Sequence, residues 1–154
     1  MVKAIEYLEQ VEKMDAKINS NIEELAQLEA LATKTTSVMG GERVQASGSQ
    51  DKMADGVVKI VNMQAELNRQ IDEYIDFKNQ ARDVISACDA DCMTLLHKRY
   101  FLYKRWEEIA VEMNFTYQWV AGGLHQRALS QAQRVLDERK GDQDGRNHES
   151  NNQT

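Results

Sequence analysis

The apolar residues of this 154-residue chain recur at helical spacing over most of its length. In residues 2–32 they follow one another at steps of three, four or seven. The stripe comprises Val11, Met14, Ile18, Leu25 and Leu28, widened by Ile5, Leu8 and Ile22. Positions at these steps share one face of an α-helix. Charged residues fill the other faces, so the pattern predicts a long amphipathic helix that needs a partner to cover its stripe.

Residues 50–88 predict a second long helix with a more regular repeat. Its apolar seam alternates steps of four and three over about five heptads, as in a two-helix coiled coil. The seam comprises Met53, Val57, Ile60, Gln64, Leu67, Ile71, Tyr74, Lys78, Ala81, Ile85 and Cys88. Between the two helices, residues 33–49 are rich in glycine, serine and threonine and predict a loop. Residues 1–88 therefore predict an antiparallel helical hairpin, or coiled coil, with a loop at about 33–49.

A hairpin of two helices buries little surface by itself. We therefore expect a homodimer through the coiled coil, with a four-helix arrangement as one option. The alternative is a monomer in which the C-terminal domain folds back on the hairpin. The repeat does not decide whether the long helices pair within one chain or between chains.

Residues 89–140 predict a second, smaller helical domain. Asp89 to Asp91 interrupts the heptads and caps a helix from Cys92 to about Tyr103. A helix over Trp106–Met113, a turn over Asn114–Tyr117 and a helix from near Gln118 towards Leu136 follow. The expected core comprises Leu95, Leu96, Tyr100, Trp106, Ile109, Ala110, Met113, Val120, Leu124 and Ala128. This is the pattern of a helix-turn-helix unit, whose second helix can enter the DNA major groove.

The remaining sequence features bound the class of protein. Residues 141–154 are polar and without pattern, which predicts a disordered tail. The chain has no proline and no apolar run long enough to cross a membrane, and its N-terminal pattern leads us to expect no signal peptide. Two cysteines without a secretory signal indicate free thiols in the cytoplasm. The fold class that we predict is therefore all-α, and the location cytoplasmic.

Candidate chemistry is sparse. Cys88, Cys92 and His97 have the spacing C-x3-C-x4-H, which lacks a fourth ligand and differs from zinc-finger spacing. We interpret the cysteines as small apolar fillers and expect neither a metal nor a cofactor. The glycines lack the Lys-Ser/Thr pair of a phosphate-binding loop, and no nucleophile-base set stands out, so we do not expect an enzyme.

Charge is distributed unevenly along the chain. The net charge is -6, but residues 1–92 hold 10 Lys and Arg against 17 Asp and Glu, a net -7. Residues 93–140 hold 8 Lys and Arg against 5 Asp and Glu, a net +3. Any contact with DNA is therefore expected in the C-terminal domain. An acidic coiled coil beside a near-neutral domain is the alternative interpretation.

The pattern RYF-x3-RWEEIA-x2-M, then a turn, then V-x3-LHQRAL resembles region 4 of bacterial sigma factors. It resembles still more a family of small phage and prophage proteins of Gram-positive bacteria with a sigma-region-4-like end. That family includes late transcription regulators and autolysin-regulator-like proteins, and the resemblance covers roughly residues 1–137. It implies a DNA-binding transcriptional regulator, encoded by a phage or prophage and acting in the bacterial host cell. Because sigma region 4 also touches RNA polymerase, host polymerase is a second expected partner.

The expected DNA contacts follow from the helix-turn-helix pattern. Thr116 is placed to cap the second helix, whose free N–H groups favour a phosphate oxygen. Gln118 can pair with adenine through two hydrogen bonds. The other expected contacts to double-stranded DNA are Tyr117, His125, Gln126, Arg127, Arg134, Lys104 and Arg105, with Lys98 and Arg99 as further phosphate ligands. Arg105 and Arg127 have an alternative, which is to pair with Glu107 or Glu108.

Gly122 and Gly123 depart from the sigma pattern. The resemblance implies basic and polar side chains on this outer face, and the spacing carries one residue more than the family pattern. The sequence therefore predicts either a kink in the helix or a close approach of its backbone to DNA or a partner. A bare face of this kind favours the alternative function, a protein-interaction module that binds host RNA polymerase or another host regulator without sequence-specific DNA contact.

Overall fold

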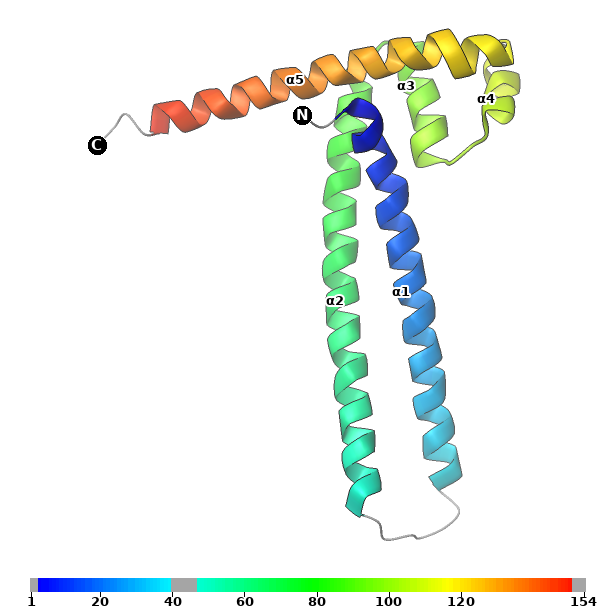
Figure 1. The fold of residues 1–154 in the computed structure, drawn as a ribbon, viewed down its shortest axis with the longest axis vertical. Coiled ribbons are helices and arrows are strands. Elements are labelled where there is room, and N and C mark those ends of the chain that lie inside the picture. The colour runs from blue at the N-terminus through cyan, green and yellow to red at the C-terminus, as the bar shows by residue number, and fades with distance from the viewer. Residues whose placement is uncertain (1–2, 40–46, 151–154) are drawn as a thin grey trace. The chain divides into compact units, whose positions relative to one another are not determined.

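A computed structural model describes residues 3–39 and 47–150, and every element in these two ranges is helical (Figure 1). The prediction of an all-α protein is confirmed. The long helices are α1, Ala4–Met39, and α2, Ser47–Ser86. They are followed by α3, Ala90–Leu96; α4, Trp106–Met113; and α5, His125–Ser150. Two π-helical turns complete the chain: η1, His97–Phe101, follows α3, and η2, Trp119–Leu124, runs directly into α5.

The chain forms two compact units. One comprises Met14–Ile75, here called the helix-pair unit, and the other comprises Met1–Lys13 with Asp76–Thr154, here called the C-terminal unit. The sequence suggested a boundary at residues 88 and 89. The structure divides the chain elsewhere, because the first turns of α1 and the last turns of α2 pack with the C-terminal helices. None of the helices in the described ranges has the length and apolar character that a membrane span needs.

In the helix-pair unit α1 and α2 run side by side in opposite directions (Figure 1). The Asn21 side chain donates to Gln70 Oε1 at 2.6 Å, and the Gln64 side chain donates to Glu29 Oε1 at 3.0 Å. The residue number rises on one helix as it falls on the other, so the pairing is antiparallel.

Two positions of the predicted seam lie outside it. Val57 is 55% exposed, and Gln64 is exposed at the edge of the pair. Heptad spacing places both residues close to the inner face, but it does not by itself decide which of these positions the partner helix covers. Met63 and Gln70 are more covered than either.

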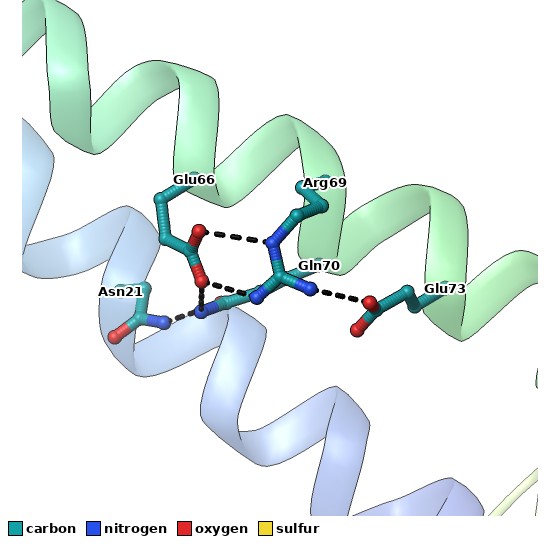
Figure 2. A network of polar contacts seen from close by, with 5 residues as sticks. All are labelled: Asn21, Glu66, Arg69, Gln70 and Glu73. Carbon is teal, nitrogen blue, oxygen red and sulfur yellow. Dashed lines mark hydrogen bonds and ion pairs between the residues drawn. The ribbon is translucent and has the colours of Figure 1, made fainter.

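A network of polar side chains lies on α2 and reaches across to α1 (Figure 2). Arg69 binds Glu66 through two nitrogens, at 3.0 and 2.5 Å, and also pairs with Glu73. The Gln70 side chain donates at 3.2 Å to Glu66 Oε1, the oxygen that also accepts from Arg69 Nη2. Gln70 Oε1 in turn accepts from the Asn21 side chain. The hydrogen bonds from Arg69, and then from Gln70, lower the pKa of Glu66 to about 2. The network orders this edge of the pair, although exposed ion pairs contribute little to stability.

The helix ends differ from those predicted. Helix α1 continues to Met39 and α2 begins at Ser47, so both ends of the expected loop at 33–49 are helical. Thr33 is tolerated because its hydroxyl donates to the Glu29 carbonyl at 2.9 Å. The middle of that loop, 40–46, lies outside the described residues. At the other end α5 continues to Ser150, where a disordered tail was expected from residue 141.

The extension of α5 has a physical reason. Once a helix is nucleated on packed residues, each further residue adds one hydrogen bond, and no proline stops it. Residues 141–146 are all exposed, so none of these six is part of a hydrophobic core. Residues 151–154 of the expected tail lie outside the described residues.

The C-terminal unit holds most of the buried hydrophobic side chains. Eight of the ten predicted core residues of this domain are buried, and Trp106 and Met113 are half-buried. Phe101, Cys92 and Ala132 join the core, together with residues from the ends of α1 and α2: Ala4, Leu8, Val11, Ala81, Val84 and Ile85. The backbone N–H of Ala4 donates to Gln133 Oε1 at 2.7 Å, which ties the start of α1 to α5.

Candidate nucleic-acid interface

The first helix of the site begins at a capped end, as predicted. Asp89 has an extended backbone, and its side chain accepts from the Cys92 N–H at 3.1 Å. The predicted helix from Cys92 to Tyr103 is formed by α3 and η1 together, over Ala90–Phe101. Tyr103 then takes a positive φ of 55°, which turns the chain towards α4.

The predicted turn is present between α4 and η2. Asn114 adopts the left-handed conformation, with φ 56° and ψ 37°, which asparagine tolerates better than most residues. Thr116 Oγ1 accepts from the Trp119 N–H at 3.2 Å, which confirms the predicted cap. The Thr116 carbonyl accepts from the Val120 N–H at 3.1 Å. The second helix therefore begins at Tyr117, one residue before the expected start.

The two glycines lie in the π-helical turn η2. A π-turn holds one residue more than an α-helical turn. This fits the extra residue in the sequence spacing, and Val120 and Leu124 on either side both remain buried. A Cβ on Gly123 would lie 2.5 Å from Cζ3 of Trp119, whereas a Cβ on Gly122 would meet nothing within 4 Å. We predicted a kink, or an approach of the backbone to DNA or a partner; the close approach that the structure shows at Gly123 is instead within the chain, between the Trp119 indole and the backbone.

The start of the second helix is presented to solvent. We call Phe115, Thr116, Tyr117, Gln118 and Trp119 the turn face. All five are exposed, Tyr117 at 49% and Trp119 at 43%. Three of the five are aromatic, and none carries a formal charge. Nearby on α4, Val111 is 77% exposed. The turn face is thus shaped by aromatic rings around a hydroxyl and an amide.

Most expected phosphate ligands before α4 are paired with acidic side chains. Lys98 Nζ donates to one oxygen of Glu112 at 2.5 Å, and Lys104 Nζ pairs with the other oxygen. The hydrogen bond from Lys104, and to a smaller extent that from Lys98, lowers the pKa of Glu112. The Arg105 guanidinium lies 3.7 Å from Glu108, the predicted alternative partner, and the Arg105 N–H donates to Glu108 at 3.0 Å.

The expected phosphate ligands after the glycines differ in their surroundings. Arg127 lies 2.7 Å from Asp89, so the alternative prediction of Glu107 or Glu108 as its partner was wrong. The pairing follows the fold, which brings the start of α3 beside α5. Gln131 donates to the same Asp89 carboxylate at 2.7 Å. The Asp89 carboxylate accepts hydrogen bonds from Gln131, the largest cause, and from Cys92, and these hold its pKa well below the usual range.

Gln126 and Arg134 are exposed on α5. Arg134 borders a pocket of about 410 Å³. The other residues around this pocket are Ala87, Asp89, Gln131, Val135 and Glu138. Acidic groups therefore stand close to Arg134, as they do to Arg127.

His125 faces the interior of the C-terminal unit. Its Nε2 lies 2.8 Å from the Tyr100 hydroxyl, and its ring packs edge-on against Trp106 at 4.6 Å between centroids. The Arg99 guanidinium covers the Trp106 ring at 4.6 Å. Burial lowers the pKa of His125 and raises the pKa of Tyr100 to about 12. His125 therefore joins η1 and α4 to the start of α5, and its ring is not presented with the turn face.

The two cysteines are free thiols. Cys92 is buried and Cys88 is half-buried. Burial is the largest cause that raises the pKa of Cys92, to about 12, so its thiol stays protonated at neutral pH. Among the described residues, no three or more His, Cys, Asp and Glu side chains gather where they could hold a metal ion.

Comparison of the chain with family models, with curated proteins and with solved structures finds no significant match in any of the three. The function is therefore inferred from the geometry of the turn face and from the sequence motifs.

Proposed function

We propose that residues 89–140 are a sigma-region-4-like helix-turn-helix that binds double-stranded promoter or operator DNA. The protein would then be a phage- or prophage-encoded transcriptional regulator of the bacterial cytoplasm. One observation carries the proposal. The helix that starts at Tyr117 is anchored by buried Val120 and Leu124, while its capped first turn is exposed. Recognition helices contact base edges with residues at this end.

In this proposal each exposed group has a separate task. Gln118 reads a base edge, with adenine as the base that its amide can bind twice. The free N–H groups of the first turn, beside Thr116, receive a phosphate oxygen. Tyr117 and Trp119 contact the sugar or the thymine methyl group. Further phosphate contacts fall to Lys104, Arg105, Gln126, Arg127 and Arg134.

Charge sets the expected strength of this contact. Lys98 and Lys104 share Glu112, and Arg127 binds Asp89, so these cations must exchange a carboxylate for a phosphate. Exchanging one anionic partner for another gains less binding free energy than pairing a phosphate with a cation that has no partner. We therefore expect a modest non-specific affinity and a clear dependence on salt.

The second candidate is a protein-interaction module whose turn face binds host RNA polymerase or another host regulator. The observation in its favour is the exposed apolar surface of Val111, Phe115, Tyr117 and Trp119. Exposed aromatic side chains are enriched at the centres of protein interfaces. With either function, we propose that the protein forms a homodimer through the coiled coil of α1 and α2.

A selection from random duplex DNA, followed by fluorescence anisotropy at two salt concentrations, tests the first candidate. Gln118→Ala is expected to weaken binding to the selected duplex by about 10-fold or more, and to reduce the preference over random DNA. Gln80→Ala, an exposed glutamine on α2, is the matched control and should bind as the unaltered protein does. If the selection enriches no sequence and no duplex is retained at low salt, the proposal of DNA binding is refuted. Capture of purified host RNA polymerase that depends on Trp119 would then support the second candidate.

A further inference from the structure

Helix α2 carries a second apolar stripe that α1 leaves uncovered. Val57, Val58 and Val61 are 55%, 56% and 54% exposed, although valine is usually buried. Ala54 and Ala65 are exposed beside them. Valine is also a poorer helix former than alanine, so three exposed valines in two turns gain nothing for the isolated helix.

The stripe has the spacing of a helix-packing seam. Ala54, Val58, Val61 and Ala65 are separated by steps of four, three and four, which keep them on one side of the helix. The sequence Ala-x3-Val-x2-Val-x3-Ala also has the same residue types and steps when it is read backwards. A two-fold axis between residues 59 and 60 would therefore place Val58 against Val61 of a second copy, and Ala54 against Ala65. Such self-complementarity is what a two-fold symmetric interface requires.

The edges of the stripe are compatible with this antiparallel pairing. On one edge Asp55 would face Asn62 of the second copy, and on the other edge Val57 would face Gln64. No like charges meet at either edge. A parallel pairing would continue the seam along α2 and set Asp72 against Asp72 of the second copy, which is unfavourable.

The helix-pair unit also has little core of its own. Among its described side chains, the hydrophobic ones that are buried are Ile18 and Leu67, and each keeps some exposed surface. Stable interfaces bury roughly 1,200–2,000 Å² in total, which four layers of alanine and valine do not reach alone. The expected contact is therefore reversible and depends on concentration.

We propose that the stripe of Ala54, Val58, Val61 and Ala65 is the contact between two copies of this chain, with their α2 helices antiparallel. The inference deepens the proposed homodimer, since it names the surface and the symmetry. It does not depend on DNA binding.

Sedimentation velocity of the full chain over a range of concentrations tests the surface. Val58→Glu and Val61→Glu would each bury a carboxylate in the seam, and each should raise the dimer dissociation constant about 100-fold or more. Ala26→Glu is the control, because it introduces the same carboxylate at an exposed position of α1 in the helix-pair unit, outside the stripe. It should leave the dissociation constant unchanged. Circular dichroism of each variant checks that the helical content is retained.

A mixture of two variants tests the symmetry. Val58→Lys and Val61→Glu should each be monomeric alone, and mixing them should restore a heterodimer, because antiparallel pairing sets the new lysine against the new glutamate. If the unaltered chain stays monomeric up to about 1 mM, the homodimer and this surface are both refuted. If it dimerises but Val58→Glu and Val61→Glu dimerise equally well, the surface is refuted while the homodimer stands. Neither outcome affects the DNA-binding proposal, which the selection tests separately.

Discussion

The contrast between two adjacent glycines gives the sharpest prediction about the turn face. Gly123→Ala introduces a Cβ at 2.5 Å from Cζ3 and 2.8 Å from Cε3 of Trp119. Both contacts are far inside the usual van der Waals distance, so the indole must leave its position. Gly122→Ala introduces the same methyl group where nothing lies within 4 Å. The two variants therefore share the gain in helix propensity and differ in the displacement of one ring.

Helix propensity and overpacking together set the expected difference in the free energy of unfolding between the two variants. Replacing a helical glycine by alanine stabilises by up to about 1 kcal/mol. Overpacking costs about 1–3 kcal/mol, and the low end applies here because Trp119 is 43% exposed and its ring can rotate towards solvent. Gly122→Ala should thus be slightly more stable than the unaltered protein. Gly123→Ala should be less stable than Gly122→Ala by roughly 1–2 kcal/mol.

Urea unfolding followed by circular dichroism measures the difference in stability. Acrylamide quenching of tryptophan fluorescence, measured for both variants in a Trp106→Phe background, reports the exposure of the Trp119 ring. Quenching should increase in Gly123→Ala and stay unchanged in Gly122→Ala. Equal stabilities together with equal quenching in the two variants would refute the packing of Trp119 on Gly123. The outcome also bears on function, because a displaced Trp119 changes the turn face without altering Gln118.

Three further predictions concern charged and titratable groups. Asp89→Ala removes the cap of α3 and the partner of Arg127, and should lower the thermal unfolding midpoint measured by circular dichroism. The pKa of Asp89 is lower in the folded protein than in the unfolded chain, so its carboxylate stabilises the fold fully above the ordinary aspartate pKa of about 3.9. This stabilisation is lost as pH falls through the lowered pKa, and the difference in thermal midpoint between the unaltered protein and Asp89→Ala should shrink accordingly. The pKa of His125 is also lowered in the fold, so its contribution is present above about pH 6.5 and is lost as pH falls below that value; thermal midpoints between pH 7.5 and 5 should fall less steeply in His125→Asn. Glu112→Gln should release two lysines and raise the affinity for duplex DNA, with a steeper salt dependence in anisotropy titrations, whereas the exposed neighbour Glu107→Gln should raise it less.

The sequence predicted those features that periodicity controls. The bounds of α4, the cap at Thr116 and the buried positions Ile109, Val120 and Leu124 all follow from local spacing and hydrogen-bonding chemistry. Such features depend on residues within one or two turns of each other. Local pattern therefore suffices for them.

The features that the sequence missed depend on contacts between distant segments. Arg127 and Asp89 are 38 residues apart, and no local rule brings them together. The exposure of Val57 depends on how α1 crosses α2, which heptad spacing leaves undefined. The π-turn at Gly123 had a sequence signal, the extra residue in the motif, but the ring that occupies the space could be found only from the structure.

In the proposed function, the exposed start of the second helix is the surface that meets DNA. Titration of the isotope-labelled full chain with a selected duplex, followed by amide NMR, tests it most directly. The largest shifts should fall on Thr116, Tyr117, Gln118 and Trp119, and the shifts at Val58 and Val61 should be small. Large shifts confined to residues outside the turn face, or none at a saturating concentration of duplex, would contradict it.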